Sequence, residues 1–158
     1  MVTTLDNYDL KLLKEIQRNA HTPQTELASR VSLSPAAVNR RLRRLADESV
    51  IDRYVAVLTP EKIGYPLTIV SMIEVESEQI DLLDGMKRTF AECAQIQQCY
   101  YVAGEWDFVV IFSVRHMEEY NELTRSLFFA NNNVKRFKTL VSMSRVKVGL
   151  EIPIVLTV

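Results

Sequence analysis

The residue types best suited to reading a nucleic acid are concentrated in one short stretch, residues 34–44. At 100° per residue, several of them fall on one side of a helix or at its edge: Ala36, Asn39, Arg40, Arg43 and Arg44. Asn and Arg side chains make paired hydrogen bonds to adenine and guanine edges in the major groove of DNA. Ala36 is small enough for the start of such a helix to approach the groove floor. The stretch is therefore a candidate DNA-reading helix.

The same arginines allow a simpler interpretation, because most runs of charge are a solvated helix face. Arg41 lies nearer the apolar side of the helix by the same angular count. Its stem could cover core surface, or its guanidinium could bond to backbone instead of DNA. DNA binding is favoured only when the run is taken with the elements that precede it.

Three helices with short connections are predicted to position this stretch. The first carries an apolar stripe at spacings of three and four: Leu5, Tyr8, Leu12, Leu13 and Ile16. Thr22 before Pro23, and Ser34 before Pro35, are each typical of an N-cap followed by proline at the first helical position. Only residues 32–34 separate the second helix from the third. Two short helices joined by so tight a turn, the second of them basic, predict a helix-turn-helix.

Charge is distributed unevenly along the chain. Its 158 residues are 47% hydrophobic and 25% charged, which is typical of a globular protein, and the net charge is −1. Residues 1–58 hold nine basic and seven acidic side chains, whereas residues 59–158 hold ten and thirteen. Five of the nine basic residues lie between Arg40 and Arg53, so positive charge is focused around the predicted third helix.

Other residue types exclude several classes of site. Cys93 and Cys99, even with His21 and His116, are too few and too widely spaced for a zinc site or a disulfide scaffold. There is no Ser/His/Asp set and no Gly-rich phosphate loop. No apolar run approaches the roughly 20 residues that span a bilayer, and the first residues lack a secretory signal. We expect a soluble, cytoplasmic protein without metal, cofactor, membrane partner or enzymatic activity.

The periodicity changes after Glu48. Residues 50–58 alternate as in a strand or short ribbon, and Pro60, Gly64 and Pro66 then interrupt the pattern. We therefore predict a helix-turn-helix domain at residues 1–50, a strand-containing linker at 51–66 and a second domain at 67–158.

The second domain has the predicted order βαββαβ. Strands are expected near residues 67–76, 96–102, 108–114 and 134–148, with helices on the apolar stripes that start at Ile80 and Met117. This order is the split βαβ of a ferredoxin-like α+β sandwich, in which two helices cover one side of a four-stranded sheet. Further apolar residues are available for the other side: Val70, Met72, Tyr100, Val102, Val109, Ile111 and Leu140. Burying that side against a second copy predicts a homodimer.

Two sets of residues carry a resemblance to a known family. The first set lies in the N-terminal half: Leu5-Asp6, Asp9, Glu26-Leu27-Ala28, Leu33-Ser34, Val38, Arg41-Leu42, Arg44-Leu45, Val50-Ile51 and Tyr54. The second is the run from Val102 to Phe108, which is similar to a Gly-x-aromatic-Asp turn between the second and third strands. On these residues the chain resembles the Lrp/AsnC family of prokaryotic transcription regulators over nearly its whole length.

The resemblance implies a winged-helix-like helix-turn-helix tied by a linker to a sensing domain that dimerises and assembles further, commonly to octamers. It also implies an effector, an amino acid or a related metabolite, bound between dimers beside the turn. The residues that it indicates for this effector are Gly104, Glu105, Trp106 and Asp107, with Tyr101 and Thr139 as neighbours.

The turn has suitable chemistry for such a ligand. Asp107 could accept the ammonium of an amino acid, and backbone N–H groups near Gly104 could bind its carboxylate. A glycine and an acid in a hairpin are more often only a turn, so both interpretations stay open at this point. Some members of the superfamily instead decarboxylate a tetrapyrrole, but His116 is the only histidine of the second domain and is expected to begin a helix.

Three positions depart from the family's pattern. Ser32 and Ser49 stand where relatives often have glycine, and His21 stands where an arginine is common. The change at His21 could remove one contact to a DNA phosphate.

The resulting hypothesis is that a dimer inserts its two Pro35–Arg44 helices into successive major grooves of double-stranded DNA, about 34 Å apart. Most contacts are expected from four side chains: Ser34, Asn39, Arg40 and Arg43. Pro35, Ala36 and Arg44 are expected beside them on the same surface. The alternative is an assembly module that no longer binds DNA, which four arginines on one short helix disfavour.

Overall fold

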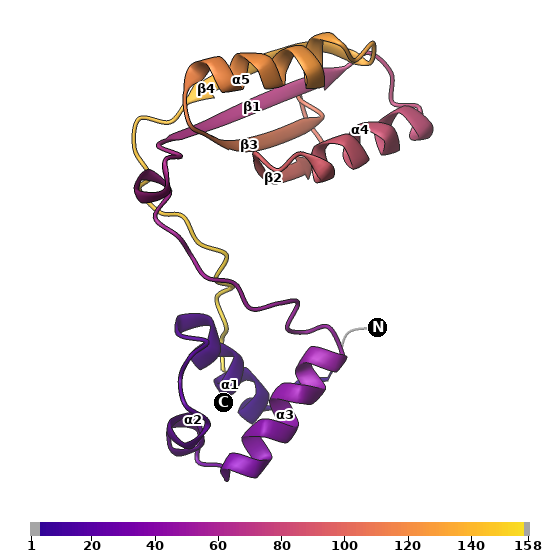
Figure 1. The fold of residues 1–158 in the computed structure, drawn as a ribbon. Coiled ribbons are helices and arrows are strands. Elements are labelled where there is room, and N and C mark those ends of the chain that lie inside the picture. Colours follow the sequence, from indigo (N-terminus) through magenta and orange to yellow (C-terminus); the bar gives the residue numbers. More distant parts are fainter. Residues whose placement is uncertain (1–3, 157–158) are drawn as a thin grey trace. The chain divides into compact units, whose positions relative to one another are not determined.

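The computed structural model describes residues 4–156, which form two compact units (Figure 1). The first unit runs to Val57 and also includes the C-terminal segment that begins at Lys147; the second is Leu58–Val146. The C-terminal segment was expected in the second domain, but Gln17 of the first unit exchanges two hydrogen bonds with the backbone of Ile152, at 2.8 and 3.1 Å. The last two residues of the predicted tail, 157–158, lie outside the described part.

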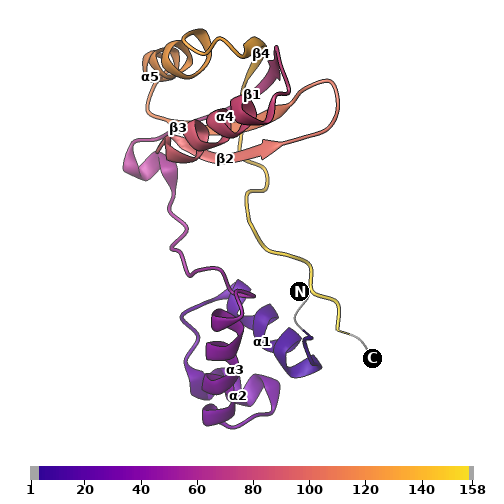
Figure 2. The same ribbon diagram turned by 90° about the vertical axis from the view of Figure 1, so that its right-hand side faces the viewer.

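The first unit is built on three helices, as predicted: α1 (Asn7–Arg18), α2 (Gln24–Val31) and α3 (Pro35–Asp47) (Figure 2). Their apolar stripes meet in one core, which contains these buried residues: Leu12, Ile16, Leu27, Ala28, Val31 and Val38. Helices as short as α2 and α3 are not stable alone, so their stability comes from packing on this core.

Of the two predicted N-caps, at Ser34 and Thr22, the structure has one. The Ser34 hydroxyl accepts the Ala37 N–H at 3.2 Å, with Pro35 as the first helical residue, which confirms the predicted start of α3. The predicted cap at Thr22 is wrong. Its hydroxyl donates to the Asn19 carbonyl at 2.9 Å, which closes the turn after α1, and so α2 has no side-chain cap.

Ser32 and Ser49 both adopt the left-handed conformation, with φ of 58° and 57°. L-residues pay about 1–2 kcal/mol for this region because Cβ approaches the carbonyl oxygen. We therefore expect Ser32→Gly to raise the free energy of unfolding by about 0.5–1 kcal/mol, after the entropy cost of glycine is subtracted. Urea unfolding followed by the helical circular dichroism signal measures this. Ser29→Gly, within α2, is the control and should lower stability; equal losses at both positions would contradict the prediction.

The linker differs from the prediction. Val50 and Ile51 both donate their N–H groups to the Leu45 carbonyl, which closes the end of α3. Residues 52–59 are exposed and form no strand, and a single 3-10 turn, η1 (Pro60–Ile63), follows. The predicted strand at 50–58 is wrong for the single chain because a strand needs a neighbour for its backbone N–H and C=O groups.

The second unit confirms the order βαββαβ. Its elements are β1 (Leu67–Val75), α4 (Ile80–Glu92), β2 (Ile96–Tyr101), β3 (Phe108–Val114), α5 (Met117–Thr124) and β4 (Val134–Val141). A π-helical turn, η2 (Arg125–Phe129), extends α5. The strands pair antiparallel in the order β2-β3-β1-β4. The last strand, β4, ends at Val141, seven residues before its predicted limit.

One face of the sheet carries the core. Alternate residues of β1 and β3 are buried against α4, α5 and η2 (Figure 1). Aromatic rings meet there edge to face, for example Phe90 on Phe108 at 5.4 Å and Phe112 on Tyr120 at 5.5 Å. The opposite face of the sheet carries the apolar residues that were predicted to pack on a second copy. They alternate with the buried residues along β1 and β3, or pair with such residues from β2 and β4: Val70, Met72, Tyr100, Val109, Ile111 and Leu140. Within the described residues, no helix of the second unit packs on this opposite face.

A buried acid joins the start of α5 to its surroundings. The Glu119 carboxylate accepts from the Arg115 backbone N–H at 2.8 Å and guanidinium at 3.1 Å, and from Gln95 at 3.2 Å. His116 caps the helix, since its Nδ1 accepts the Glu119 N–H at 3.2 Å, as expected of a residue that begins a helix. The Arg115 guanidinium, by bonding this carboxylate, holds the pKa of Glu119 below its ordinary value.

This lowered pKa predicts a pH dependence of stability. A carboxyl with a lower pKa in the folded than in the unfolded protein adds stability above its ordinary pKa, and this is lost as the pH falls through the folded value. We expect the second unit to lose urea resistance between pH 6 and pH 3, and Glu119→Gln to lose less over that range. Glu118→Gln, at an exposed neighbour, is the control. Identical pH profiles for wild type and Glu119→Gln would contradict this assignment.

Candidate DNA interface and effector turn

The outer face of α3 presents most of the residues predicted to contact DNA. Ser34, Pro35, Ala36, Arg40 and Arg43 are exposed. Within residues 4–156, neither Arg40 nor Arg43 forms an ion pair or hydrogen bond through its guanidinium. Both cations are therefore available to a phosphate or a base edge.

The Asn39 side chain already forms one hydrogen bond within the protein. Its Nδ2 donates to Oε1 of Gln24 at 3.3 Å, and Gln24 is the exposed first residue of α2. An exposed residue at a helix start can offer its backbone N–H to a phosphate. Gln24 therefore belongs to the same surface, although nothing in its local sequence distinguishes it.

Arg44 is placed differently from Arg40 and Arg43. Its Nη2 donates to the carboxylate of Asp9 in α1, at 2.5 Å, and Arg41 bonds the same carboxylate at 2.8 Å. The four arginines of α3 thus divide into an outer pair and an inner pair. The sequence marked Arg41 as nearer the core but grouped Arg44 with the outer pair.

The turn between β2 and β3 is fixed to the end of β1. The Asp107 N–H donates to the Ile73 carbonyl at 2.9 Å, and Oδ2 of Asp107 accepts the Val75 N–H at 2.7 Å. The Asp107 carbonyl also accepts the Val102 N–H at 2.8 Å. Gly104, with φ of +152°, occupies a conformation that other residues rarely adopt. Asp107 therefore has a structural role, and one of its oxygens is already engaged by the protein.

The exposed side of this turn meets β4 through Arg136. The Arg136 guanidinium lies over the Trp106 ring, 4.6 Å from its centroid, and donates to Glu105 at 3.3 Å. It also pairs with Glu74, opposite it in the β1–β4 register. Hydrogen bonds from Lys135, and then from Arg136, hold the pKa of Glu74 below its ordinary value. The sequence did not indicate Arg136 as a site residue, because it lies 30 residues from Trp106 and becomes its neighbour only through strand pairing.

Tyr101 and Thr139 do not join this cluster. The Tyr101 ring packs on Phe108 at 5.1 Å, and Lys87 of α4 lies above it, also at 5.1 Å. The Thr139 hydroxyl is 2.6 Å from the Tyr120 hydroxyl, on the face that the helices cover. The structure therefore brings together Gly104, Glu105, Trp106 and Asp107, but not the two neighbours suggested beside them.

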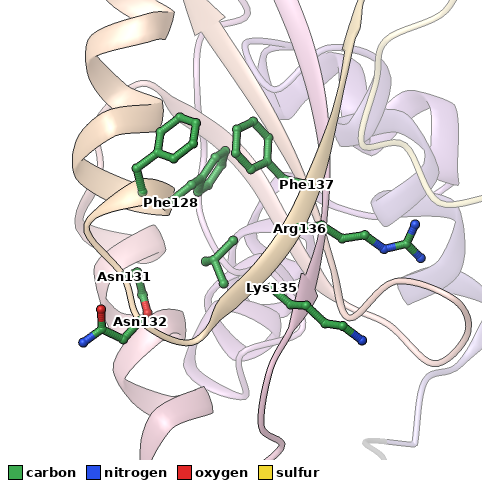
Figure 3. Close-up of a pocket in the computed structure, with 8 residues that line it drawn as sticks. Phe128, Asn131, Asn132, Lys135, Arg136 and Phe137 are labelled. Carbon is green, nitrogen blue, oxygen red and sulfur yellow. The ribbon is translucent and has the colours of Figure 1, made fainter.

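A shallow cavity of about 490 Å³ lies beside the start of β4, lined by Phe128, Phe129, Asn131, Asn132, Val134, Lys135, Arg136 and Phe137. In Figure 3, the side chains of Lys135 and Arg136 extend from one side of the strand, whereas Asn131 and Asn132 lie on the loop at the other side. Its cations are held by Glu74. Because its polar groups do not converge, this cavity is not a convincing ligand site.

The family follows from two matches that together span most of the chain. Residues 68–152 match the Lrp/AsnC ligand binding domain, and residues 5–52 match a winged helix-turn-helix DNA-binding domain. The chain belongs to the Lrp/AsnC family. It is therefore a DNA-binding transcription regulator and not an enzyme, which confirms the function that the resemblance implied.

Curated relatives of this Lrp/AsnC regulator align over nearly its full length. An uncharacterised HTH-type transcriptional regulator of Sinorhizobium fredii is 40% identical over 95% of this chain and 89% of its own. The leucine-responsive regulatory protein of Haemophilus influenzae is 32% identical over 90% and 86%, respectively.

Solved structures share the fold. A Neisseria meningitidis transcriptional regulator, in complex with L-Met, superposes with a TM-score of 0.87 at 23% identity and covers 95% of this chain and 97% of its own. An AsnC family regulator of Agrobacterium tumefaciens gives 0.88 at 24%, covering 94% and 97%. The leucine response regulatory protein of Mycobacterium tuberculosis gives 0.78 at 27%, covering 94% and 100%.

In the part of the chain that the structure describes, no three His, Cys, Asp or Glu side chains are grouped so that they could hold a metal ion. Among the same residues, no helix has both the length and the apolar character needed to cross a membrane.

Proposed function

We propose that this Lrp/AsnC regulator reads double-stranded DNA with the outer face of α3 and that an amino acid bound beside the turn at 104–107 controls it. The observation that carries the DNA contacts is the division of the arginines on α3. Arg40 and Arg43 are exposed and unpaired among the described residues, on a helix whose start is capped by Ser34. These cations can bind DNA without breaking an internal ion pair.

The other α3 contacts follow from position. Ser34, Pro35 and Ala36 form the exposed start of the helix, where small side chains and free backbone groups approach the groove. Asn39, held by Gln24, presents an amide for base reading. Arg44 contributes less directly, because its guanidinium is bonded to Asp9.

The effector is proposed to lie against the exposed side of the turn. Trp106 offers an apolar surface, while Arg136 and Glu105 offer opposite charges for the carboxylate and ammonium of an amino acid. The bound L-Met of the Neisseria meningitidis relative supports this ligand class. Binding would exchange the Arg136–Glu105 pair for two pairs with the ligand, which keeps the charges compensated.

A dimer is the smallest assembly that presents two α3 helices to successive grooves. The uncovered sheet face, with Val70, Met72 and Ile111 in its middle, supplies an apolar surface for a second copy. Further assembly, to an octamer in the family pattern, would place effector sites between dimers and let a ligand change the spacing of the DNA-binding units. Such a regulator acts where its DNA is, in the cytoplasm.

The test is thermal unfolding of the full chain with each common amino acid in turn. A ligand at about 100 times its dissociation constant adds about 2.7 kcal/mol to the folded state. We expect one or two amino acids to raise the melting temperature, and Arg136→Gln to abolish the rise. Lys135→Gln is the matched control, because Lys135 also pairs with Glu74 but does not touch Trp106. If no amino acid stabilises the protein, the effector proposal fails and the DNA-binding function stands.

A further inference from the structure

Asp9 is the most deeply buried charged group of the first unit, at 0% exposure. Its Oδ1 accepts from Nη1 of Arg41 at 2.8 Å, and its Oδ2 accepts from Nη2 of Arg44 at 2.5 Å. Oδ2 also accepts the N–H of Asp6, where α1 begins, at 3.1 Å. A buried carboxylate is tolerated only when it is paired in this way, so the three bonds belong to one arrangement.

A second carboxylate completes the connection between the helices. Asp6 Oδ2 accepts from Arg41 at 2.7 Å, and the Arg41 guanidinium lies 5.5 Å from the centre of the Tyr8 ring. These carboxylates, Asp6 first, hold the pKa of Arg41 above its ordinary value. We call Asp6, Asp9, Arg41 and Arg44 the α1–α3 clamp. It ties the start of α1 to two successive turns of α3.

The clamp limits what Arg44 can do. The Nε atoms of Arg41 and Arg44 are buried and, within the described chain, have no hydrogen-bond partner. Each guanidinium is therefore held through its Nη atoms. The Arg44 side chain is 41% exposed. Turning Arg44 outward to a phosphate would remove one of the two cations that pair with the buried Asp9 carboxylate and leave its Oδ2 with only the Asp6 N–H, which is costly.

We propose that Asp9 is a positioning residue for DNA recognition, which acts by fixing α3 through Arg41 and Arg44 so that Arg40 and Arg43 face outward. Arg44 then contributes to DNA binding through Asp9, not by touching DNA. The rotation of α3 decides which of its arginines reach the groove, because successive residues differ by 100° around the helix. This inference rests on the proposed function, in which α3 is the DNA-reading helix.

The salt dependence of binding separates a positioning role from a contact. Loss of one phosphate contact reduces the slope of log K against log salt by about 0.9. A loosened clamp instead lowers the fraction of free protein in which α3 is oriented for binding, so affinity falls while the bound complex keeps the same phosphate contacts and the same slope. The probe is a duplex selected by the wild-type protein from a random-sequence pool, with binding followed by fluorescence anisotropy at a series of KCl concentrations. We expect Arg44→Gln to weaken binding about tenfold with an unchanged slope. Arg18→Gln, an exposed cation of α1, is the control and should leave both unchanged.

A double-mutant cycle tests the coupling. Asp9→Asn retains an oxygen for the capping box but loses the charge that holds both arginines. We expect the Asp9→Asn, Arg44→Gln double variant to bind no more weakly than the worse single variant, because both changes open the same clamp. If Asp9→Asn does not fold, as judged by its helical circular dichroism, the slope of Arg44→Gln alone decides.

Three outcomes overturn the inference. A slope reduced by about 0.9 in Arg44→Gln would show a direct phosphate contact. Additive losses in the cycle would show that Asp9 and Arg44 act separately, and unchanged affinity in Arg44→Gln would show that the clamp does not position α3. Arg43→Gln distinguishes the underlying function: if it also binds DNA as well as wild type, the DNA-reading role of α3 has failed, and not only the role of Asp9.

Discussion

Replacing both Arg40 and Arg43 by alanine should lower the affinity for a selected duplex at least about 30-fold at 0.15 M salt. Each arginine is worth about 1–3 kcal/mol if it makes a bidentate base contact, and 1.4 kcal/mol is a factor of ten. Neither guanidinium has a protein partner in the described chain, so its removal leaves no buried charge unpaired and should not unfold α3. Anisotropy titrations over a range of KCl concentrations give both the affinity and its salt slope.

The slope then assigns the type of contact. A slope reduced by about 1.8 indicates two phosphate contacts, whereas lost discrimination between the selected duplex and a scrambled one indicates base contacts. Arg88→Ala, which removes one positive charge from the exposed face of α4 in the other unit, is the control for each single replacement. Affinity equal to wild type in the double variant would mean that α3 does not read DNA through its outer face.

Phe112→Ala should be the most destabilising single change in the second unit, by about 3–5 kcal/mol. Phe112 is 0% exposed in β3, and its ring meets Tyr120 at 5.5 Å and Phe128 at 6.1 Å. Truncation removes these contacts and leaves a cavity that α5 cannot fill without moving. Trp106 is the only tryptophan of the chain, so its fluorescence during urea unfolding reports on this unit.

Phe129→Ala provides the comparison for this experiment. Phe129 is the same residue type only 17 positions away, but it is 72% exposed, and its ring meets that of Phe137 at 5.4 Å. We expect it to cost less than about 1 kcal/mol. Equal losses for Phe112→Ala and Phe129→Ala would place the core elsewhere than on the helix-covered face of the sheet.

Much of the fold could be predicted from the sequence because the determining interactions are local. Ser34 and Pro35 mark the start of α3 within three residues, and the alternation along β1 and β3 shows which side chains face the helices. These signals depend only on the periods of helices and strands and on capping chemistry, so they survive without knowledge of neighbouring elements. The family motifs, and with them the DNA-binding function, are likewise written in short segments.

The partners of charged groups could not be predicted in this way. Arg44 and Arg43 are adjacent and alike, but only Arg44 reaches Asp9, which lies 35 residues earlier in another helix. Arg136 similarly meets Trp106 only because β4 pairs with β1 beside the turn. Ion pairs between distant residues depend on the final packing of elements, and a helical angle alone leaves Arg44 at the edge of either face.

The sequence by itself therefore determined the helix-turn-helix, the βαββαβ order and the stretch that we propose reads DNA. Only the tertiary structure decided which arginines of that stretch lack a partner among the described residues, which acid holds the others, and which cation lies beside the turn at 104–107. It also showed that residues 52–59 have no strand partner among residues 4–156. The physical reason is the same throughout: periodicity and caps are properties of neighbouring residues, whereas pairing of charges and strands depends on groups that only folding brings together.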